Sequence, residues 1–383
     1  MFDDFVGTPG PNLLDGFDRG NARPIDYFWL MFPANLITKL VQYTNSYAVR
    51  KMVQNGAVDD KWEEVTEPEM KAYLGINIFM GIKELPEVEM YWSTDPFIGN
   101  TGIQQVMTCN RFHKITLYFH ASNPDTKPQG TPAYDRLYKV HEIISAVSDT
   151  FFREYPLCHE VSVDEAMIKF SGRLSFRQYM PVNPIKWGMK AWMLCDTKSA
   201  YLSKDVYLGR QDTHTARGLK FNVLTKLTAH IRNTFRRIFF VNFFTSLPLL
   251  QRLLDYGLYA CGTIRVNCIG FLKDLKKPGD VRNRADFKIL QYGNSNITAS
   301  VWKDKKLVYH ISSLSDPSDV RDAQRRCGRD SLHLCQPHTV YAYNQFIGDV
   351  DLHDQFRMKY NVGHMSKKWW RYLSSYTNKC LPD

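Results

Sequence analysis

The hydrophobic period of the sequence changes near His159, and this change restricts the folds that the chain can adopt. Before it, apolar residues recur at three- and four-residue spacing, which is typical of amphipathic helices. One such stripe runs through Phe28, Phe32, Leu36, Leu40 and Tyr43. After it, Val161 and Val163 alternate with polar residues, as in a strand that ends on Asp164. The sequence therefore predicts helices first and a sheet afterwards.

Residues 26–155 are predicted to form an N-terminal α-helical region. Thr66 is a good N-cap for one of its helices, and Glu69 three residues later completes the pattern of a capping box. Helical spacing also continues through two later segments, 100–120 and 135–154. Residues 1–25 are rich in Gly, Asp, Asn and Pro, so they are predicted to be a flexible lead.

Residues 156–266 are predicted to hold the first part of a core with a mixed sheet flanked by helices. The predicted order is three strands, a helix, a strand, a helix and a strand. These elements lie near residues 161–164, 190–196, 201–208, 219–227, 238–241, 249–253 and 259–264. The run 238–241 is apolar throughout, which is typical of a strand buried on both faces. Together with the helical region, this order predicts an α+β fold.

Residues 267–340 are basic and rich in turns, and they are predicted to form a β-rich insertion. Its expected strands lie at 297–302 and 306–312, where apolar and β-branched residues are concentrated. Helical spacing returns from Asp349 onward, so residues 341–383 are predicted to be the helical C-terminal part of the core.

Charge is unevenly distributed along the chain. Residues 1–100 hold 15 acidic side chains against 8 basic ones, and the whole chain carries a net charge of +10, so residues 101–383 carry +17. A segment as basic as residues 101–383 attracts a polyanion, and nucleic acid is the commonest polyanion inside cells. Charge by itself leaves a solvated basic surface equally open.

Several other chemistries lack their sequence signals. The eight cysteines form no Cys-x-x-Cys pair, so neither a zinc site nor a dense disulfide scaffold is predicted, and a reduced intracellular compartment is expected. No Gly-rich phosphate loop and no Gly-x-Ser-x-Gly elbow occur. No stretch approaches the roughly 20 apolar residues of a membrane helix. The start of the chain, with Asp3 and Asp4, does not match a secretory signal.

Three aspartates are candidates for a metal site. Asp164 ends the first predicted strand, and Asp351 and Asp354 are three residues apart, so a helix would place both on one side. Two divalent cations about 3.5–4 Å apart need several carboxylates from different elements, and Mg²⁺ prefers oxygen ligands. For any one of these residues taken singly, a turn or an N-cap is the simpler interpretation.

Three blocks of the sequence carry a recognisable pattern. They are VDEAMIKFSGRLSFRQYMPVNPIKWGMK at 163–190, NFFTSLPLLQRLLDYGLYACGTIR at 242–265 and GDVDLHDQF at 348–356. Shorter blocks are YWS at 91–93, NRFHKI at 110–115, YDRLYKV at 134–140, VWKDKKLVYHIS at 301–312 and KKWWRYL at 367–373. In this order they resemble the piggyBac family of transposases, and the matches cover nearly the whole chain.

The resemblance implies an RNase H-like core of the DDE/DDD superfamily with Mg²⁺ or Mn²⁺ as its cofactor. Asp164 matches the first catalytic aspartate, Asp351 the third, and Asp354 an additional acid, and these three would bind the metal. The second catalytic aspartate should immediately precede the Asn of an Asn-x-Phe-Thr-Ser block. That Asn is Asn242, and Val241 stands before it. A neutral isopropyl group thus occupies the place of a metal-ligating carboxylate.

Other positions also depart from the family pattern. Asn183 stands where the family usually has Lys, and Asp349 replaces a Gly, so both change the charge beside the expected phosphates. Asp196 and Asp205 are the nearest alternative acids, but the family carries an Asp at the position of Asp196 without counting it catalytic. The family's cysteine-rich zinc-binding end does not follow Asp383, and the last helix is expected to be truncated.

Basic residues beside the predicted sheet and in the insertion are candidates for DNA contact. Neutralisation of phosphates by such residues gives affinity with little sequence readout. The predicted contacts are Arg173, Lys186, Lys190, Arg236, Arg237, Lys303, Lys305 and Lys306. The resemblance favours double-stranded DNA as the partner and the nucleus as the location, and it allows a homodimer.

Three functions stay open. The favoured one is a transposase-derived DNA-binding protein that is catalytically impaired by Val241. The second is an active transposase, which would cleave and join DNA at TTAA sites with a metal, as the family does. The third is a protein–protein interaction domain without DNA binding. Val241 separates the first two functions, and salt-dependent DNA binding separates the first from the third.

Overall fold

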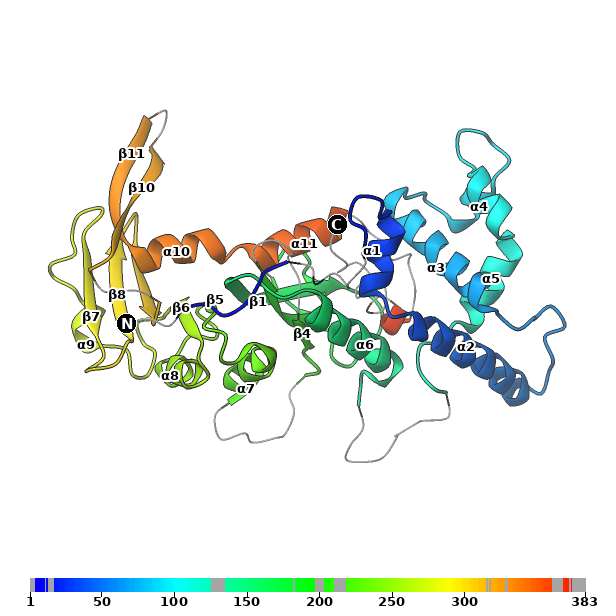
Figure 1. Cartoon of the computed structure of the whole chain (residues 1–383), viewed down its shortest axis with the longest axis horizontal. Coiled ribbons are helices and arrows are strands. Elements are labelled where there is room, and N and C mark those ends of the chain that lie inside the picture. Colours follow the sequence, from blue (N-terminus) through cyan, green and yellow to red (C-terminus); the bar gives the residue numbers. More distant parts are fainter. Residues whose placement is uncertain are drawn as a thin grey trace. The chain divides into compact units, whose positions relative to one another are not determined.

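The computed structural model describes most of the chain (Figure 1). The described residues are 4–10, 12, 17–124, 135–181, 183–196, 203–209, 218–314, 316, 318–327, 330–359, 368–371 and 373. The chain divides into two compact units. The first comprises Met1–Asn12, Tyr155–Met167 and Lys190–Asp354, and the second comprises Leu13–Glu154, Ile168–Met189 and Gln355–Asp383. Each unit is considered by itself below.

The second unit holds the N-terminal helices. They are α1 (Pro24–Met31), α2 (Ala34–Asn55), α3 (Glu67–Ile82), the 3-10 helix η1 (Val88–Trp92), α4 (Thr101–Val106), α5 (Cys109–Tyr118) and α6 (Tyr138–Glu154). The predicted helical content of this region is therefore confirmed. Residues 125–134, between α5 and α6, lie outside the described residues.

Local sequence signals explain where these helices begin and end. At the start of α3 the Thr66 hydroxyl accepts a hydrogen bond from Glu69 N at 3.4 Å, and the Glu69 carboxylate accepts one from Thr66 N at 3.0 Å. This is the expected capping box. The apolar stripe that begins at Phe28 is carried by two helices, because Pro33 has no N–H to donate and separates α1 from α2.

The main sheet has nine strands in the order β2-β3-β1-β5-β6-β9-β8-β7, with β4 paired to β3. Its strands are β1 (Glu160–Lys169), β2 (Gln178–Tyr179), β3 (Trp187–Asp196), β4 (Ser203–Val206), β5 (Arg237–Phe240), β6 (Tyr259–Thr263), β7 (Phe287–Gln291), β8 (Thr298–Lys303) and β9 (Leu307–Ser312). The predicted mixed sheet is confirmed, and β2 and β7 are additions to it.

The centre of the sheet is parallel and fully buried. β5 pairs in parallel with both β1 and β6, and Ile238, Phe239 and Phe240 each have 0% of their surface exposed. Complete burial of such a side chain stabilises the fold by about 1.5–3 kcal/mol. The apolar run in the sequence therefore marks a strand covered on both faces, as predicted.

Helices of the first unit connect and follow these strands. They are α7 (Gly218–Leu227), the 3-10 helix η2 (Ala229–Ile231), α8 (Leu247–Asp255), α9 (Lys273–Lys276), α10 (His338–Phe346) and α11 (Asp349–Lys359), the last of which continues into the second unit. Leu249, Leu250 and Leu253 form the buried side of α8. None of the helices in the described part of the chain is both long and apolar enough to span a bilayer.

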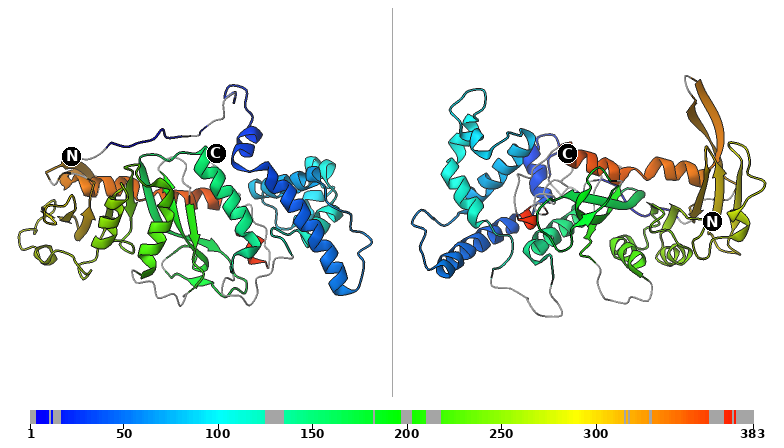
Figure 2. Two further views of the ribbon diagram at one scale, coloured as in Figure 1. Left: turned by 60° about the horizontal axis from the view of Figure 1, so that its bottom comes forward. Right: turned by 180° about the vertical axis from the view of Figure 1, so that it is seen from behind.

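The segment predicted as a β-rich insertion contributes three strands to the main sheet. β9 pairs with β6, and β8 and β7 follow it toward the edge. The expected strands near 297–302 and 306–312 correspond to β8 and β9. A separate antiparallel hairpin, β10 (Val320–Cys327) with β11 (Asp330–Pro337), was not expected. Figure 2 shows this hairpin (orange) beside β7, β8 and β9 (yellow), and Trp302 Nε1 of β8 donates to the Cys335 carbonyl of β11 at 3.1 Å.

Candidate acidic site

Asp164 lies in the middle of β1, where that strand runs beyond its neighbour β5. The sequence predicted a strand that ends on this acid, but β1 continues to Lys169. The parallel ladder between the two strands ends at the pair Val163–Phe240. Asp164 therefore occupies the first position of β1 after the ladder, which leaves its half-buried side chain at the end of β5.

Val241 is the first residue after the neighbouring strand β5. It follows Phe240, whose partner in the ladder is Val163, the residue before Asp164. Val241 is half-buried, and its carbonyl accepts hydrogen bonds from Phe244 N at 3.1 Å and Thr245 Oγ1 at 3.2 Å. Asn242 lies beyond the end of β5 and is exposed, so it belongs to this turn and not to a strand face.

Helix α11, near the C-terminal end of the sequence, carries the candidate acids Asp351 and Asp354. Asp351 lies in its first turn and is exposed, and Asp354 lies one turn later and is half-buried. Burial, and in addition the negative charges of Asp351 and Glu165, raise the pKa of Asp164 to about 7. The effect of Asp351 means that these two carboxylates lie close enough to repel each other.

Lys190 on β3 faces the same carboxylates. Its ammonium group forms an ion pair with Glu165 Oε1 and lies 5.1 Å from the ring centroid of Phe243 and 5.4 Å from that of Trp192. Its charge also opposes the rise in the pKa of Asp164. A salt bridge that is this well buried, with 14% of the Lys190 side chain exposed, fixes the ammonium group in place.

A second group of acids comprises Asp349 on α11, Asp196 on β3 and Glu160 on β1, and it was not predicted as a site from the sequence. Asp349 is 8% exposed, and its Oδ2 has no hydrogen-bond partner among the described residues. Burial, followed by the charges of Asp196 and Glu160, raises the pKa of Asp349 to about 7. Asp196 is itself buried and accepts a hydrogen bond from Cys158 N at 3.2 Å. Asp349 thus faces other acids in the interior.

The predicted DNA contacts of the first unit differ in their exposure. Arg236 is 5% exposed and donates to the carbonyls of Leu157 at 2.8 Å and Cys158 at 3.0 Å. A guanidinium bound in this way satisfies buried main-chain carbonyls. The burial of Arg236 therefore does not fit the DNA contact predicted for it. Arg237 is half-buried, with its Nη1 lying 3.6 Å from Glu160 Oε1.

Lys190, with 14% of its side chain exposed and its ammonium group paired with Glu165, is also a poor match to the contact predicted for it. The other five predicted contacts reach the surface to a greater extent. On the turn between β8 and β9, Lys305 and Lys306 are exposed and Lys303 is half-buried. Arg173 and Lys186 are exposed in the second unit. These five side chains remain available to a polyanion.

The carboxylates fit a two-metal site poorly. No group of three or more His, Cys, Asp or Glu side chains in the described part of the chain is arranged to hold a metal ion. Because the pKa of Asp164 is raised to about 7, a proton competes with any cation for its carboxylate oxygens. Val241 supplies no ligand, so the acids present are fewer than a two-metal site uses.

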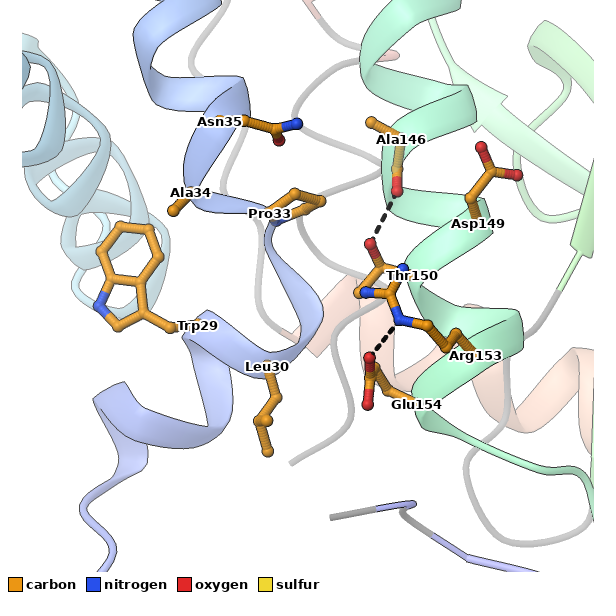
Figure 3. Close-up of a pocket in the computed structure, with 10 residues that line it drawn as sticks. All are labelled: Trp29, Leu30, Pro33, Ala34, Asn35, Ala146, Asp149, Thr150, Arg153 and Glu154. Carbon is orange, nitrogen blue, oxygen red and sulfur yellow. Dashed lines mark hydrogen bonds and ion pairs between the residues drawn. The ribbon is translucent and has the colours of Figure 1, made fainter. Parts of the chain in front are cut away.

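A pocket of about 550 Å³ lies elsewhere, in the second unit (Figure 3). It is lined by residues of α1, α2 and α6, among them Trp29, Asn35 and Glu154. Arg153 Nε contacts Glu154 Oε1 at 2.5 Å within it. None of the acids described above lines this pocket, so it forms no part of their site.

Comparisons with known proteins agree with this architecture. A model of the transposase IS4 family matches residues 23–378. The chain is 26% identical over 373 residues to human piggyBac transposable element-derived protein 3, with 92% of this chain and 60% of that protein covered. It is 28% identical over 377 residues to human piggyBac transposable element-derived protein 2, with 95% and 61% covered. The chain thus spans about three fifths of the length of these two relatives.

A solved structure shows the same fold. It is a piggyBac transposase in a synaptic complex with hairpin DNA, with a TM-score of 0.78 and 24% sequence identity. The match covers 98% of this chain and 76% of that one, which confirms the predicted α+β class. The family match extends over nearly the whole chain, and the order of strands and helices agrees with it. The chain therefore belongs to the transposase IS4 family, and within that family it is similar to the piggyBac transposable element-derived proteins.

Proposed function

We propose that the chain is a transposase-derived protein that binds double-stranded DNA in the nucleus but does not complete metal-dependent DNA cleavage. The observation that carries this proposal is the register of β1 and β5. The last pair of this ladder is Val163 with Phe240, and the next residues of the two segments are Asp164 and Val241, which the family resemblance matches to the first and second catalytic aspartates.

Metal binding at this site depends on the number and the charge of the available ligands. A valine has no lone pair to coordinate a cation, and a two-metal site needs several carboxylates to offset the charge of its ions. Transposases of this family generally use a divalent metal. Asp164 on β1 and Asp351 on α11 remain, and burial together with the charge of Asp351 raises the pKa of Asp164. The residues present therefore supply fewer ligands than a two-metal site needs, and we derive no cleavage step from them.

DNA binding depends less on the missing acid. Residues 101–383 carry a net charge of +17, and the exposed Lys305 and Lys306 belong to this basic part of the chain. The similar transposase was solved in a complex with hairpin DNA. Contacts to phosphates from such side chains give affinity without sequence readout, so we expect weak binding to any duplex. A homodimer is part of the same proposal and is checked by light scattering.

The test combines a binding assay with a cleavage assay. Fluorescence anisotropy with a labelled duplex, between about 50 and 200 mM salt, should give a log affinity that falls linearly with log salt. Incubation with supercoiled plasmid and Mg²⁺ or Mn²⁺ should leave the plasmid intact. A fluorescent fusion of the chain should accumulate in the nucleus.

Each alternative function predicts a different result. Robust Mn²⁺-dependent nicking by the unmodified protein, with joining at TTAA sites, would establish an active transposase and overturn the proposal. Absence of duplex binding even at low salt would favour a protein–protein interaction domain. Only salt-sensitive binding without nicking supports the proposal.

A further inference from the structure

Several basic side chains gather around the buried imidazole of His120 in the second unit. They come from α2, α6 and the segment 368–371, and none of them is fully exposed. They are Arg50, Lys51, Lys139, Lys368 and Arg371. We call these five residues the His120 basic cluster. All five lie outside the blocks that carry the acids, and three of them, Lys139, Lys368 and Arg371, lie in the shorter blocks 134–140 and 367–373.

Aromatic rings contact His120 and two of the five basic residues. His120 is stacked on Tyr47, with ring centroids 4.2 Å apart and an interplanar angle of 5°. Trp370 meets the His120 ring edge-on at 5.7 Å. The guanidinium of Arg371 lies 5.4 Å from the Trp370 centroid, and the ammonium of Lys51 lies 5.8 Å from that of Tyr47. Cation–π contacts of this length orient the basic groups at small cost in mobility.

The basic groups repel one another. Burial, followed by the charges of Lys139, Lys368, Arg371 and Arg50, lowers the pKa of His120 to about 4. Burial, followed by Arg371, Lys139 and Lys51, lowers the pKa of Lys368 to about 8. Like charges held together in this way reduce the stability of the fold, so packing alone gives no reason for the cluster.

One donor of the cluster has no acceptor among the described residues. Arg371 Nη2 donates to the carbonyl of Thr116, but Arg371 Nε is buried and lacks a hydrogen-bond partner there. A buried donor without an acceptor costs about 1–3 kcal/mol. An anion that enters the cluster would offset this cost as well as the repulsion between the positive charges.

We propose that the His120 basic cluster is a binding site for a phosphate group, and that in the DNA complex it takes a phosphate of the duplex backbone. The proposal of DNA as the carrier of this phosphate rests on the function proposed above. Arginine and lysine donors are the usual partners of phosphate oxygens, and several cations at one place match the charge of a phosphate better than that of a single carboxylate. The neutral His120 ring serves as a rigid base for the cluster.

The test is a charge-removing double variant with a matched control. K139Q/K368Q removes two charges from the cluster, and K61Q/K83Q removes two charges from exposed lysines of the same unit. The slope of log DNA affinity against log salt should become shallower by about 0.9 for each phosphate that K139Q/K368Q no longer neutralises. The control should keep the slope of the unmodified protein.

Stability gives a second readout that a structural role would not share. Because removal of like charges relieves repulsion, K139Q/K368Q should melt at a higher temperature than the unmodified protein at low salt. Inorganic pyrophosphate should raise the melting temperature of the unmodified protein and of the control but not that of K139Q/K368Q. If the double variant fails to fold, the single variant K139Q is measured in the same three assays.

The outcomes separate the site from the function on which it rests. If the unmodified protein binds no duplex but pyrophosphate still protects it selectively, the proposed function fails and the cluster is a site for free phosphate. If duplex binding is present but K139Q/K368Q matches the control in slope and in pyrophosphate response, the cluster is not a phosphate site and this inference is overturned.

Discussion

Asp164 on β1 and Asp351 on α11 form a pair of repelling carboxylates, and burial together with this repulsion raises the pKa of Asp164 to about 7. The pair brings together two residues that lie far apart in the sequence. Val241 follows Phe240, the last residue of β5, and Phe240 pairs with Val163, the residue before Asp164. A carboxylate at position 241 would thus join an existing acidic pair.

The substitution Val241→Asp should tighten the binding of divalent cations. The added carboxylate would supply a further oxygen ligand and a further negative charge beside Asp164, and both favour Mg²⁺ and Mn²⁺. Isothermal calorimetry on the variant and the unmodified protein measures the difference. Val241→Asn is the matched control, because it has a similar size and an oxygen ligand but no charge, and it should give little gain. Equal metal affinity in all three proteins would show that position 241 is not at the acidic site.

The substitution Asp349→Asn should stabilise the protein at high pH. The pKa of Asp349 is raised to about 7 in the fold, above its unfolded value near 3.9. The folded state therefore favours the protonated carboxyl, and this contribution is present at low pH and lost as pH rises from about 4 to 7. Urea unfolding at pH 8 should show the variant more stable by roughly 1–3 kcal/mol, with the gap closing toward pH 4.

The exposed Asp60 supplies the control for that measurement. Asp60→Asn should change the free energy of unfolding by less than about 0.5 kcal/mol at either pH. If Asp349→Asn behaves in the same way, the buried acidic group at Asp349, Asp196 and Glu160 does not raise the pKa of Asp349 as described.

Arg236 should act on stability and not on DNA affinity. Arg236→Met leaves the carbonyls of Leu157 and Cys158 without their donors, which should lower the free energy of unfolding by roughly 2–4 kcal/mol. Arg265→Met, at an exposed position, should have almost no effect on stability. Folded Arg236→Met protein should show an unchanged salt slope in DNA binding. A shallower slope of log DNA affinity against log salt in this variant would show that Arg236 does contact a phosphate.

Charge reversal on the turn between β8 and β9 should weaken DNA binding. Lys305→Glu with Lys306→Glu places two negative charges at an exposed turn, and inclusion of Lys303→Glu should enhance the effect. The weakening should be uniform across duplex sequences, because backbone contacts carry no sequence information. Anisotropy with several unrelated duplexes measures this. The pair Lys61→Glu and Lys83→Glu gives the same charge change elsewhere, and an equal weakening there would mean that only net charge matters.

The sequence alone was sufficient where the signal is local. The capping box at Thr66 and Glu69, the apolar run of β5 and the leucines of α8 each depend on residues within a few positions of one another. Periodicity and capping report such local choices directly. The family resemblance likewise rests on contiguous blocks of residues, so it needed no coordinates.

Other features depend on which segments meet in space. β1 extends well past Asp164 because of neighbours that its own sequence does not identify, and the hairpin of β10 and β11 carries no clear alternation of apolar residues. Arg236 looks like any basic residue in the sequence, yet the fold binds its guanidinium to two main-chain carbonyls. The exposure and pairing of a charged side chain depend on its spatial neighbours, so they cannot be predicted from the conformational propensities of the local sequence.

Some features of the acidic site were likewise predictable from the sequence, and others depended on the fold. The sequence by itself determined which acids are present, and it identified Val241 as the neutral residue in the pattern. Only the tertiary structure decided that Asp351 repels Asp164 and that Asp349 is buried against Asp196 and Glu160. The reason is that the charge state of a carboxyl depends on burial and on charges within a few ångströms, and residues distant in the sequence supply both.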